Sequence, residues 1–371
     1  MSLLGISLYP HLQSIPDMIR QLDHACSTGY TEVYTTIQSR QAWENESSLS
    51  TPFRWLISEC RKRHLHLHVD INRKIMDQLK ATPSDLSAFV RLGIRIIRLD
   101  FGFEEDHEFV AEMTCNENGV LIEDNTSMQA NPIHRIKAMQ KKGNLNNYIT
   151  VHNFFPLPDT GLSFEDTVKN ARLFHACGIC TGVFLNSLDS TSLLFPQGHG
   201  LCTVENHRYK PASLSMSELF AAGVFDYIFF GDGDPSLEEM KQVSLINTNQ
   251  CVEVPVYFSP YLSSQLKEKL LNTRMKSRSD QPEFLIRAVQ TRGIASICPT
   301  NTIDRDKLCI TMNNSLSGKY EGELQIALKN MPGREYINVI GQIDMRSEPL
   351  IQLIRYGKIS FRLIEAQPET K

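Results

Sequence analysis

The feature that most constrains the fold of this chain is an alternation, through its first two thirds, of short apolar runs with amphipathic segments of helical period. The apolar runs, each of strand length, lie at residues 3–9, 31–37, 65–71, 94–102, 119–126, 148–154, 181–187 and 226–232. The segments suited to helices lie at residues 14–30, 51–64, 83–93, 104–116, 131–143, 163–178, 215–223 and 235–247. Eight strand–helix units in about 245 residues match a TIM barrel, a closed parallel sheet inside a ring of helices.

The main alternative to this barrel is a doubly wound open sheet. Such a sheet usually has fewer strands and carries a glycine-rich phosphate loop after its first strand. Here the first predicted strand runs into the turn Tyr-Pro-His at residues 9–11, which does not match that motif. The first helix also has clear limits, because Ser14 suits an N-cap and Gly29 suits a helix stop. We therefore predict a (β/α)8 barrel.

The residue pattern changes after about residue 250, where short β-type segments alternate with turn residues. These segments lie at residues 252–260, 293–299, 308–313, 320–328, 336–343 and 357–364. Helices are expected only at residues 259–272 and 345–356. This pattern predicts a smaller β-rich domain, either a closed barrel or a sandwich. We place the TIM-barrel catalytic domain at residues 1–248 and the second domain at residues 249–371.

Charge, hydropathy and cysteine usage limit the partners of the chain. A net charge of −4 and a pI near 6.3 do not indicate nucleic-acid binding. No apolar run approaches the roughly 18 residues of a membrane span. The nine cysteines have no framework spacing and suggest reduced thiols, and the single pair Cys177 and Cys180 is a weak metal signal. We expect a cytoplasmic protein with neither nucleic acid nor membrane as a partner, and we predict no metal site.

Polar residues gather at the carboxyl ends of the predicted strands, where a TIM barrel carries its active site. A single strand-end aspartate often only caps the next helix, and we prefer this interpretation for Asp234. Caps do not explain polar groups after nearly every strand. The predicted substrate-binding residues are Ser7, Tyr9, Glu123, Asn125, His152, Asn153, Asn186 and Asp232.

Carboxylates and amides dominate these strand ends, as a site for a polyhydroxylated ligand requires. In glycoside hydrolysis one carboxylic acid protonates the leaving oxygen, and a second carboxylate attacks the anomeric carbon or activates water. Asp70 and Asp100, which end neighbouring strands, suit this chemistry. The long loop after residue 187 adds Glu205 and a positive group formed by His207 and Arg208. Such a group can hold a phosphate dianion, although a solvated basic loop is the alternative interpretation.

Five motifs carry a resemblance to a known family. They are GISLYP at 5–10, RLDFGF at 98–103, VHNFFP at 151–156, GLCTVENHR at 200–208 and YEGELQI at 320–326. Together they resemble the 6-phospho-N-acetylmuramidases (MupG-like proteins) of peptidoglycan recycling, nearly end to end. The resemblance implies a TIM barrel followed by a cyclophilin-like β-barrel. It also implies cytosolic hydrolysis of the β-1,4 bond between N-acetylmuramic acid 6-phosphate and N-acetylglucosamine. The matching residues are Asp70, Asp100, Asn125, His152, Asn153, Glu205, His207 and Arg208.

Roles within this reaction are predicted as follows. Glu205 is the first choice for the general acid, because a loop carboxylate can reach the leaving group. Asp70 or Asp100 would supply the second carboxylate, and the site would need no cofactor. His207 and Arg208, with Arg292 from the second domain, would bind the 6-phosphate of a phosphorylated amino sugar or disaccharide.

Two other functions stay open at this point. A metal-dependent sugar-phosphate isomerase or epimerase would use the same acidic residues as metal ligands. A non-catalytic phosphosugar-binding protein would use them only for recognition. Whether hydrolysis retains or inverts the anomeric configuration depends on the separation of the carboxylates, which a sequence does not supply.

Overall fold

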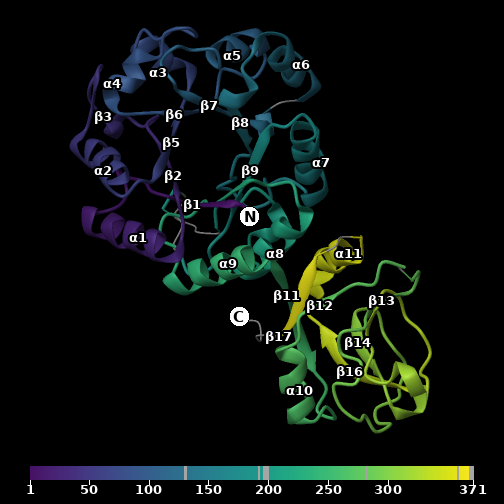
Figure 1. Cartoon of the computed structure of the whole chain (residues 1–371). Helices are drawn as coiled ribbons and strands as arrows, with labels where there is room; N and C mark the ends of the chain where they lie inside the picture. The colour runs from purple at the N-terminus through teal and green to yellow at the C-terminus, as the bar shows by residue number, and fades with distance from the viewer. Residues whose placement is uncertain (129–131, 191–192, 195–199, 281, 357–358, 367–371) are drawn as a thin grey trace. The chain divides into compact units, whose positions relative to one another are not determined.

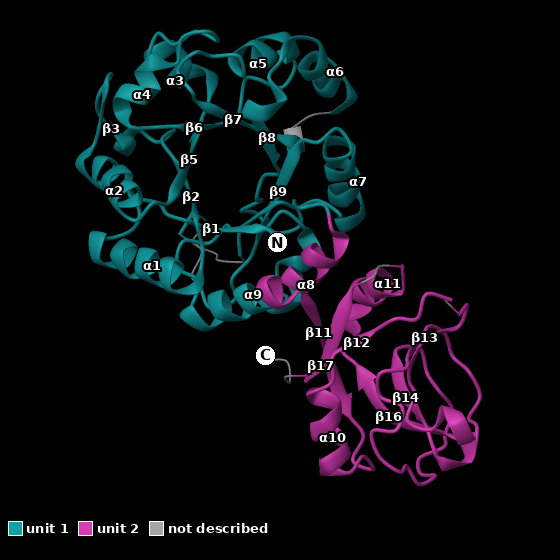
Figure 2. Ribbon diagram, viewed as in Figure 1, with its two compact units in different colours: residues 1–215, 224–245 teal, residues 216–223, 246–371 magenta. Residues whose placement is uncertain are grey.

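The computed structural model describes residues 1–128, 132–190, 193–194, 200–280, 282–356 and 359–366 (Figure 1). The chain forms two compact units (Figure 2). The first comprises residues 1–215 and 224–245, and the second comprises residues 216–223 and 246–371. The domain boundary that we predicted between residues 248 and 249 stays a prediction.

The first unit is a closed barrel of eight parallel strands, which confirms the predicted TIM barrel. Around the ring the strands follow the order β1-β10-β9-β8-β7-β6-β5-β2, and helices cover the outside (Figure 1). Each predicted strand is present. The strands are β1 Leu3–Ser7, β2 Glu32–Thr36, β5 His66–Ile71, β6 Ile96–Leu99, β7 Leu121–Asn125, β8 Tyr148–Val151, β9 Cys180–Leu185 and β10 Tyr227–Phe230.

Alternation along each strand divides the barrel wall into an outer and an inner face. On β6, Ile97 and Leu99 belong to the apolar core beneath the helices. Arg98 and Asp100, one step out of phase, therefore face the interior. Beside β9 and β10 the interior is aromatic, with the rings of Phe184 and Phe229 centred 5.3 Å apart. Because alternate residues of a strand face opposite sides, the polar residues between the apolar ones point toward the barrel axis.

The predicted helices are present, with ends set by local chemistry. Helix α1 (Ile15–Thr28) begins at Ser14, whose hydroxyl accepts from the backbone N–H of Asp17, and ends at Gly29, whose φ of +80° suits glycine. The other predicted helices are α2 Thr51–Lys62, α4 Ser87–Leu92, α5 His107–Met113, α6 Pro132–Lys142, α7 Phe164–His175, α8 Ala212–Ala222 and α9 Leu237–Asn249. The prediction missed the small hairpin β3 Trp43–Asn45 and β4 Ser48–Leu49 and the short helix α3 Arg73–Gln78.

The second unit is a nearly closed seven-stranded β-barrel of mixed direction, in the order β12-β17-β11-β16-β14-β15-β13. Both predicted helices are present, as α10 Ser264–Leu271 and α11 Glu348–Tyr356. The strands are β11 Cys251–Phe258, β12 Met275–Lys276, β13 Leu285–Ala288, β14 Cys309–Asn313, β15 Leu324–Ala327, β16 Ile337–Ile343 and β17 Ser360–Glu365.

The strand predicted at residues 293–299 is wrong. The chain turns at Gly293, where φ is +73°, and continues without a strand partner through this segment. The backbone N–H of Ile297 instead donates to Oε1 of Glu321 at 2.8 Å. A side chain thus takes the place of a neighbouring strand, which an apolar pattern alone does not reveal.

Within the described ranges, no helix combines the length and the apolar character that crossing a membrane requires.

Candidate active site

Two aspartates lie together at the mouth of the barrel, where β5 and β6 end. Asp70 is the next-to-last residue of β5, and Asp100 directly follows β6. Gln38, in the segment after β2, joins them: its Nε2 donates to Oδ2 of Asp70 at 2.5 Å and to Oδ2 of Asp100 at 2.9 Å. The structure therefore brings together the two strand-end carboxylates predicted from the sequence.

An arginine and two amides complete this cluster. Arg98 Nη1 donates to Asp70 Oδ1 at 2.8 Å, and Arg98 Nη2 donates to Asn153 Oδ1 at 2.5 Å. Asn125 Nδ2 donates to Asp100 Oδ1 at 3.2 Å. Asp70 is only 4% exposed, whereas Asp100 and Asn153 are half-buried. A ligand entering the mouth can reach Asp100 and Asn153 directly, and Asp70 lies deeper.

The environment of Asp70 favours its protonated form. Burial is the main cause that raises the pKa of Asp70 to about 6, and the nearby charge of Asp100 acts in the same direction. The hydrogen bonds and charge of Arg98 oppose the shift without cancelling it. A carboxyl group with a pKa in this range can hold a proton close to neutral pH and release it during a reaction.

His152 and Asn153 are adjacent at the tip of β8 but point to opposite sides of the barrel wall. Asn153 faces the interior and contacts Arg98. His152 is fully buried on the other side, where its Nδ1 lies 3.1 Å from the hydroxyl of Ser127. Burial lowers the pKa of His152 to about 4. Of this predicted pair, the structure brings Asn153 to the mouth and keeps His152 away from it.

Glu123 on β7 is also deeply buried. Its Oε2 contacts Nδ1 of His68, and its Oε1 forms an ion pair with Nε of Arg98 at 3.1 Å. Both oxygens are thus occupied within the barrel. The next residue, Asp124, faces the opposite side and pairs with Arg135 on α6 at 3.0 Å. Glu123 thus reaches the mouth only through Arg98, whereas Asn125, at the end of this strand, contacts Asp100 directly.

Glu205 and Arg208 form a clasp between two loops. Glu205 accepts two hydrogen bonds from Arg208, at 2.6 and 2.7 Å, and two from the backbone N–H groups of Asp159 and Gly161. Arg208 donates further to the carbonyl of Phe155 at 2.9 Å. The hydrogen bonds from Arg208 are the main cause that lowers the pKa of Glu205 to about 2. This loop clasp fixes the segment after β9 to the segment after β8.

The remaining predicted residues of the barrel are fully buried and hold loops in place. Ser7 and Tyr9 donate their hydroxyls to backbone carbonyls at the end of β10, each at 2.6 Å. Asn186 donates to two loop carbonyls at 3.0 and 3.2 Å. Asp232 Oδ2 accepts from two backbone N–H groups, and burial raises the pKa of Asp232 to about 6.

We compared the sequence with models of known protein families. A family model described as 6-phospho-N-acetylmuramidase, N-terminal, matches residues 4–245. A second, described as 6-phospho-N-acetylmuramidase, C-terminal, matches residues 252–364. The chain belongs to the 6-phospho-N-acetylmuramidase family.

Two solved structures resemble the chain over nearly its whole length. An uncharacterized B. cereus protein is 27% identical, with a TM-score of 0.84 over 98% of this chain and 100% of that chain. A conserved Enterococcus faecalis protein of unknown function is 22% identical, with a TM-score of 0.71 over 98% of this chain and 96% of that chain. At 22% identity, the similarity to the Enterococcus faecalis protein shows only that the two share a fold. No curated protein matches the chain.

The predicted phosphate ligands of this 6-phospho-N-acetylmuramidase family member have other contacts. Arg208 is fully buried in the loop clasp, and His207 is fully buried with its ring 6.0 Å from that of Phe164. Arg292 belongs to the second unit, where its Nε donates to Oε2 of Glu323 at 2.9 Å. Phosphate binding by these three residues stays a prediction.

Two residues of the mouth were missed by sequence reasoning. Arg98 lies two residues before Asp100 in the same predicted strand, so strand alternation places both on one face and could have identified it. Gln38 lies just beyond β2, where its position depends on the path of the loop. No periodic signal identifies a residue of that kind.

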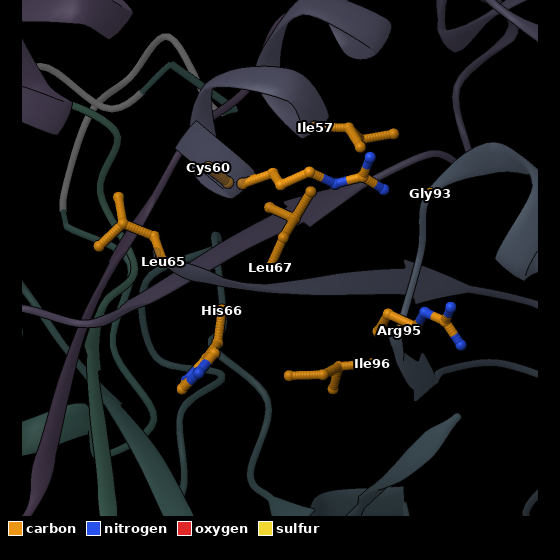
Figure 3. Close-up of a pocket in the computed structure, with 9 residues that line it drawn as sticks. Ile57, Cys60, Leu65, His66, Leu67, Gly93, Arg95 and Ile96 are labelled. Atoms are coloured by element: carbon orange, nitrogen blue, oxygen red, sulfur yellow. The ribbon is translucent and has the colours of Figure 1, made fainter. Parts of the chain in front are cut away.

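A cavity of about 430 Å³ lies at the other end of the barrel, where strands begin. His66 opens β5 and Ile96 opens β6, and both line this cavity (Figure 3). Most of its lining is apolar, with Arg61 and Arg95 adding positive charge. The cavity is therefore distinct from the cluster around Asp70 and Asp100.

Proposed function

We propose that this protein is a 6-phosphoglycoside hydrolase that cleaves N-acetylmuramic acid 6-phosphate–N-acetylglucosamine. Membership of the 6-phospho-N-acetylmuramidase family supports the reaction class and the phosphorylated amino-sugar substrate. The observation that carries the proposal is the pair Asp70 and Asp100, joined by one amide at the barrel mouth. Two carboxyl groups in one cleft are the minimum that this chemistry needs.

We assign the proton transfer to Asp70 and the attack on the anomeric carbon to Asp100. Asp70 is the carboxyl whose pKa is raised to about 6, so it can carry the proton that the leaving oxygen takes up. Asp100 is the more exposed of the two and therefore the one nearer to an entering sugar. Asn153 supplies a polar group for the sugar's hydroxyls or its N-acetyl group, and Asn125, which is only 2% exposed, holds Asp100 in place through its hydrogen bond.

The separation of the two carboxyl groups favours a retaining mechanism. Their Oδ2 atoms both bind Gln38 Nε2, at 2.5 and 2.9 Å, so they cannot be farther apart than those two bonds laid end to end. Retaining glycosidases hold their carboxyl groups about 5–5.5 Å apart, whereas inverting enzymes need roughly 6.5–9.5 Å to admit a water. The pair leaves too little room for that water.

The contacts of Glu205 favour a positioning role over the acid role predicted for it. An acid with a pKa near 2 is ionised at neutral pH and has no proton to donate. Its two oxygens are also committed to Arg208 and to two backbone N–H groups. We propose that Glu205 shapes the rim of the cleft through the loop clasp.

The metal-dependent alternative has less support. The cation beside Asp70 is Arg98, at 2.8 Å, so that carboxylate already has a charged partner. In the described part of the chain, no group of three or more His, Cys, Asp or Glu residues is arranged to hold a metal ion. The mouth therefore fits direct acid catalysis by carboxyl groups.

The test is incubation of the full chain with the 6-phosphorylated disaccharide and with its unphosphorylated counterpart, monitoring release of N-acetylglucosamine. We expect release only from the phosphorylated substrate. Equal rates on both would contradict phosphate recognition, and binding without release would select the non-catalytic alternative. Parallel assays with a chelator separate hydrolysis by carboxyl groups from a metal-dependent reaction.

A further inference from the structure

A chain of buried charges runs from Asp70 through the barrel interior. Asp70 pairs with Arg98 at 2.8 Å, and Arg98 Nε pairs with Glu123 Oε1 at 3.1 Å. Glu123 Oε2 contacts His68 Nδ1, and His68 Nε2 lies 2.9 Å from Glu32 Oε2. All five residues are at most 4% exposed. They come from β2, β5, β6 and β7, and so connect neighbouring walls of the barrel.

The contacts of His68 identify it as an imidazolium. Each ring nitrogen faces a carboxylate oxygen, from Glu123 on one side and from Glu32 on the other. A neutral imidazole has one N–H, so it would leave one buried carboxylate opposite a lone pair. A protonated ring donates to both. Burial alone would lower the pKa of His68, but the two glutamates outweigh it and raise the pKa to about 9.

The charge on His68 influences Asp70 because His68 and Arg98 both contact Glu123. One oxygen of Glu123 binds His68 and the other binds Arg98, so the carboxylate is balanced by two cations. Arg98 is likewise divided between Glu123 and Asp70. In an interior without water, loss of the positive charge on His68 leaves Arg98 as the remaining cation beside Glu123. The ion pair between Glu123 and Arg98 then becomes stronger. Less of the arginine's charge then stabilises ionised Asp70.

We propose that His68 is a positioning residue for the proposed reaction, which sets the protonation of Asp70 through Glu123 and Arg98. Its kinetic consequence rests on the proposed function, whereas its effect on Asp70 does not. On the β10 side, His68 packs against uncharged rings, those of Tyr227 and Phe229, centred 5.9 and 5.1 Å away.

The other groups that act on Asp70 are also defined. Gln38 donates to its second oxygen, and Asp100 and the phenols of Tyr34 and Tyr9 interact with it electrostatically. Burial raises the pKa of both phenols well above the usual value, so both are neutral below pH 9. Among the described residues, Arg98 and Asp100 are therefore the charged groups that surround Asp70 most closely, and Arg98 connects it to His68 through Glu123.

His66 supplies a matched control. Its Nδ1 lies 3.0 Å from Oε1 of Glu32, the same glutamate that His68 contacts. Unlike His68, it has a side chain that is 64% exposed, at the edge of the cavity shown in Figure 3. No contact joins it to Glu123 or Arg98 in the hydrogen bonds of the described residues. Replacing His66 thus alters Glu32 without touching the path to Asp70.

The experiment measures the titration of Asp70 directly. The full chain is labelled with ¹³C at the aspartate carboxyl carbons, and the Asp70 resonance is assigned by its loss in Asp70→Asn. We expect His68→Gln to raise the Asp70 pKa by about one unit or more, and His66→Gln to leave it within roughly 0.3 units. His68→Lys, which keeps a cation, should restore part of the shift. An unchanged Asp70 titration in folded His68→Gln overturns the proposal.

The double variant His68→Gln, Glu123→Gln keeps the inference testable if the single variant does not fold. It removes one positive and one negative charge together. Arg98 then no longer pairs with a carboxylate at position 123 and pairs with Asp70. We expect an Asp70 pKa equal to or below that of the unmodified protein, and a raised value would overturn the proposal. The falling limb of kcat/KM against pH should follow the same order among the variants. Because the carboxyl titration needs no substrate, failure of hydrolysis and failure of this coupling give different results.

Discussion

Asp70 and Asp100 share one hydrogen-bond donor, the side-chain nitrogen of Gln38, although they come from two different strands. This arrangement holds two carboxyl groups together at the barrel mouth, where Asp70 is buried and Asp100 is half-buried. Closely placed carboxyl groups do not ionise with equal ease, so one tends to keep its proton.

Replacing Asp100 with asparagine removes the attacking carboxylate and keeps the shape of the side chain. We expect turnover of the phosphorylated disaccharide to fall by about 10³-fold or more, because an essential carboxylate in this chemistry is lost. The midpoint of thermal unfolding should move little, since Asp100 is half-buried. Glu105→Gln, an 84% exposed carboxylate in the same loop, is the control and should retain full activity. Full activity in Asp100→Asn would remove it from the mechanism.

The products should retain the anomeric configuration of the substrate. The two carboxyl groups are too close to admit the water of an inverting mechanism. Proton NMR spectra recorded within the first minutes of hydrolysis distinguish the anomers before they equilibrate. Initial appearance of the opposite anomer would show that the two carboxyl groups act in another geometry.

The dependence of kcat/KM on pH should show a falling limb near pH 6. Asp70 must be protonated to act as the acid, and its pKa in the free protein is raised to about 6, mainly by burial. Activity controlled by this group is therefore present below that pH and declines above it. A bound phosphate dianion adds negative charge and should move the limb in kcat to higher pH. A profile that rises between pH 5 and 7 would contradict the acid role of Asp70.

Changing Gln38 to methionine removes the shared donor. The hydrogen bond from Gln38 lowers the pKa of Asp70, so its loss should raise that pKa and shift the falling limb upward by about half a pH unit. Gln41→Met, an exposed glutamine three residues later, should leave the profile unchanged. A limb that stays in place in the Gln38 variant would mean that this amide does not influence the acid.

Glu205→Gln tests the loop clasp. Arg208 is fully buried, and removing its charged partner should lower the free energy of unfolding by roughly 3 kcal/mol. Chemical denaturation measures this loss, with Asn206→Ala in the same turn as the control. If Glu205 is instead the general acid, turnover collapses while stability and substrate affinity persist. A large loss of stability supports the role of Glu205 in the loop clasp, whereas a loss of turnover alone supports the acid role.

The eight strands and the aspartates at their ends were predictable because both depend on local periodicity. The phase of apolar residues on β6 places Ile97 and Leu99 against the helices, and Asp100 follows on the inner face. The roles of individual polar residues were less predictable. Sequence patterns do not reveal that Glu205 would pair with Arg208, or that Gln38 would bridge two strands, because loop paths decide both.

Since His152 and Asn153 lie on opposite sides of one wall, neighbouring positions of the chain face different environments. A substitution at position 152 alters packing beneath the helical shell, whereas one at position 153 alters the contact with Arg98 at the barrel mouth. Position 153 can therefore change without disturbing the packing beneath the helices, whereas deeper inward positions such as those of His68 and Glu123 are themselves buried parts of the scaffold. Descendants of one ancestral barrel can diverge in chemistry while their architecture stays nearly constant.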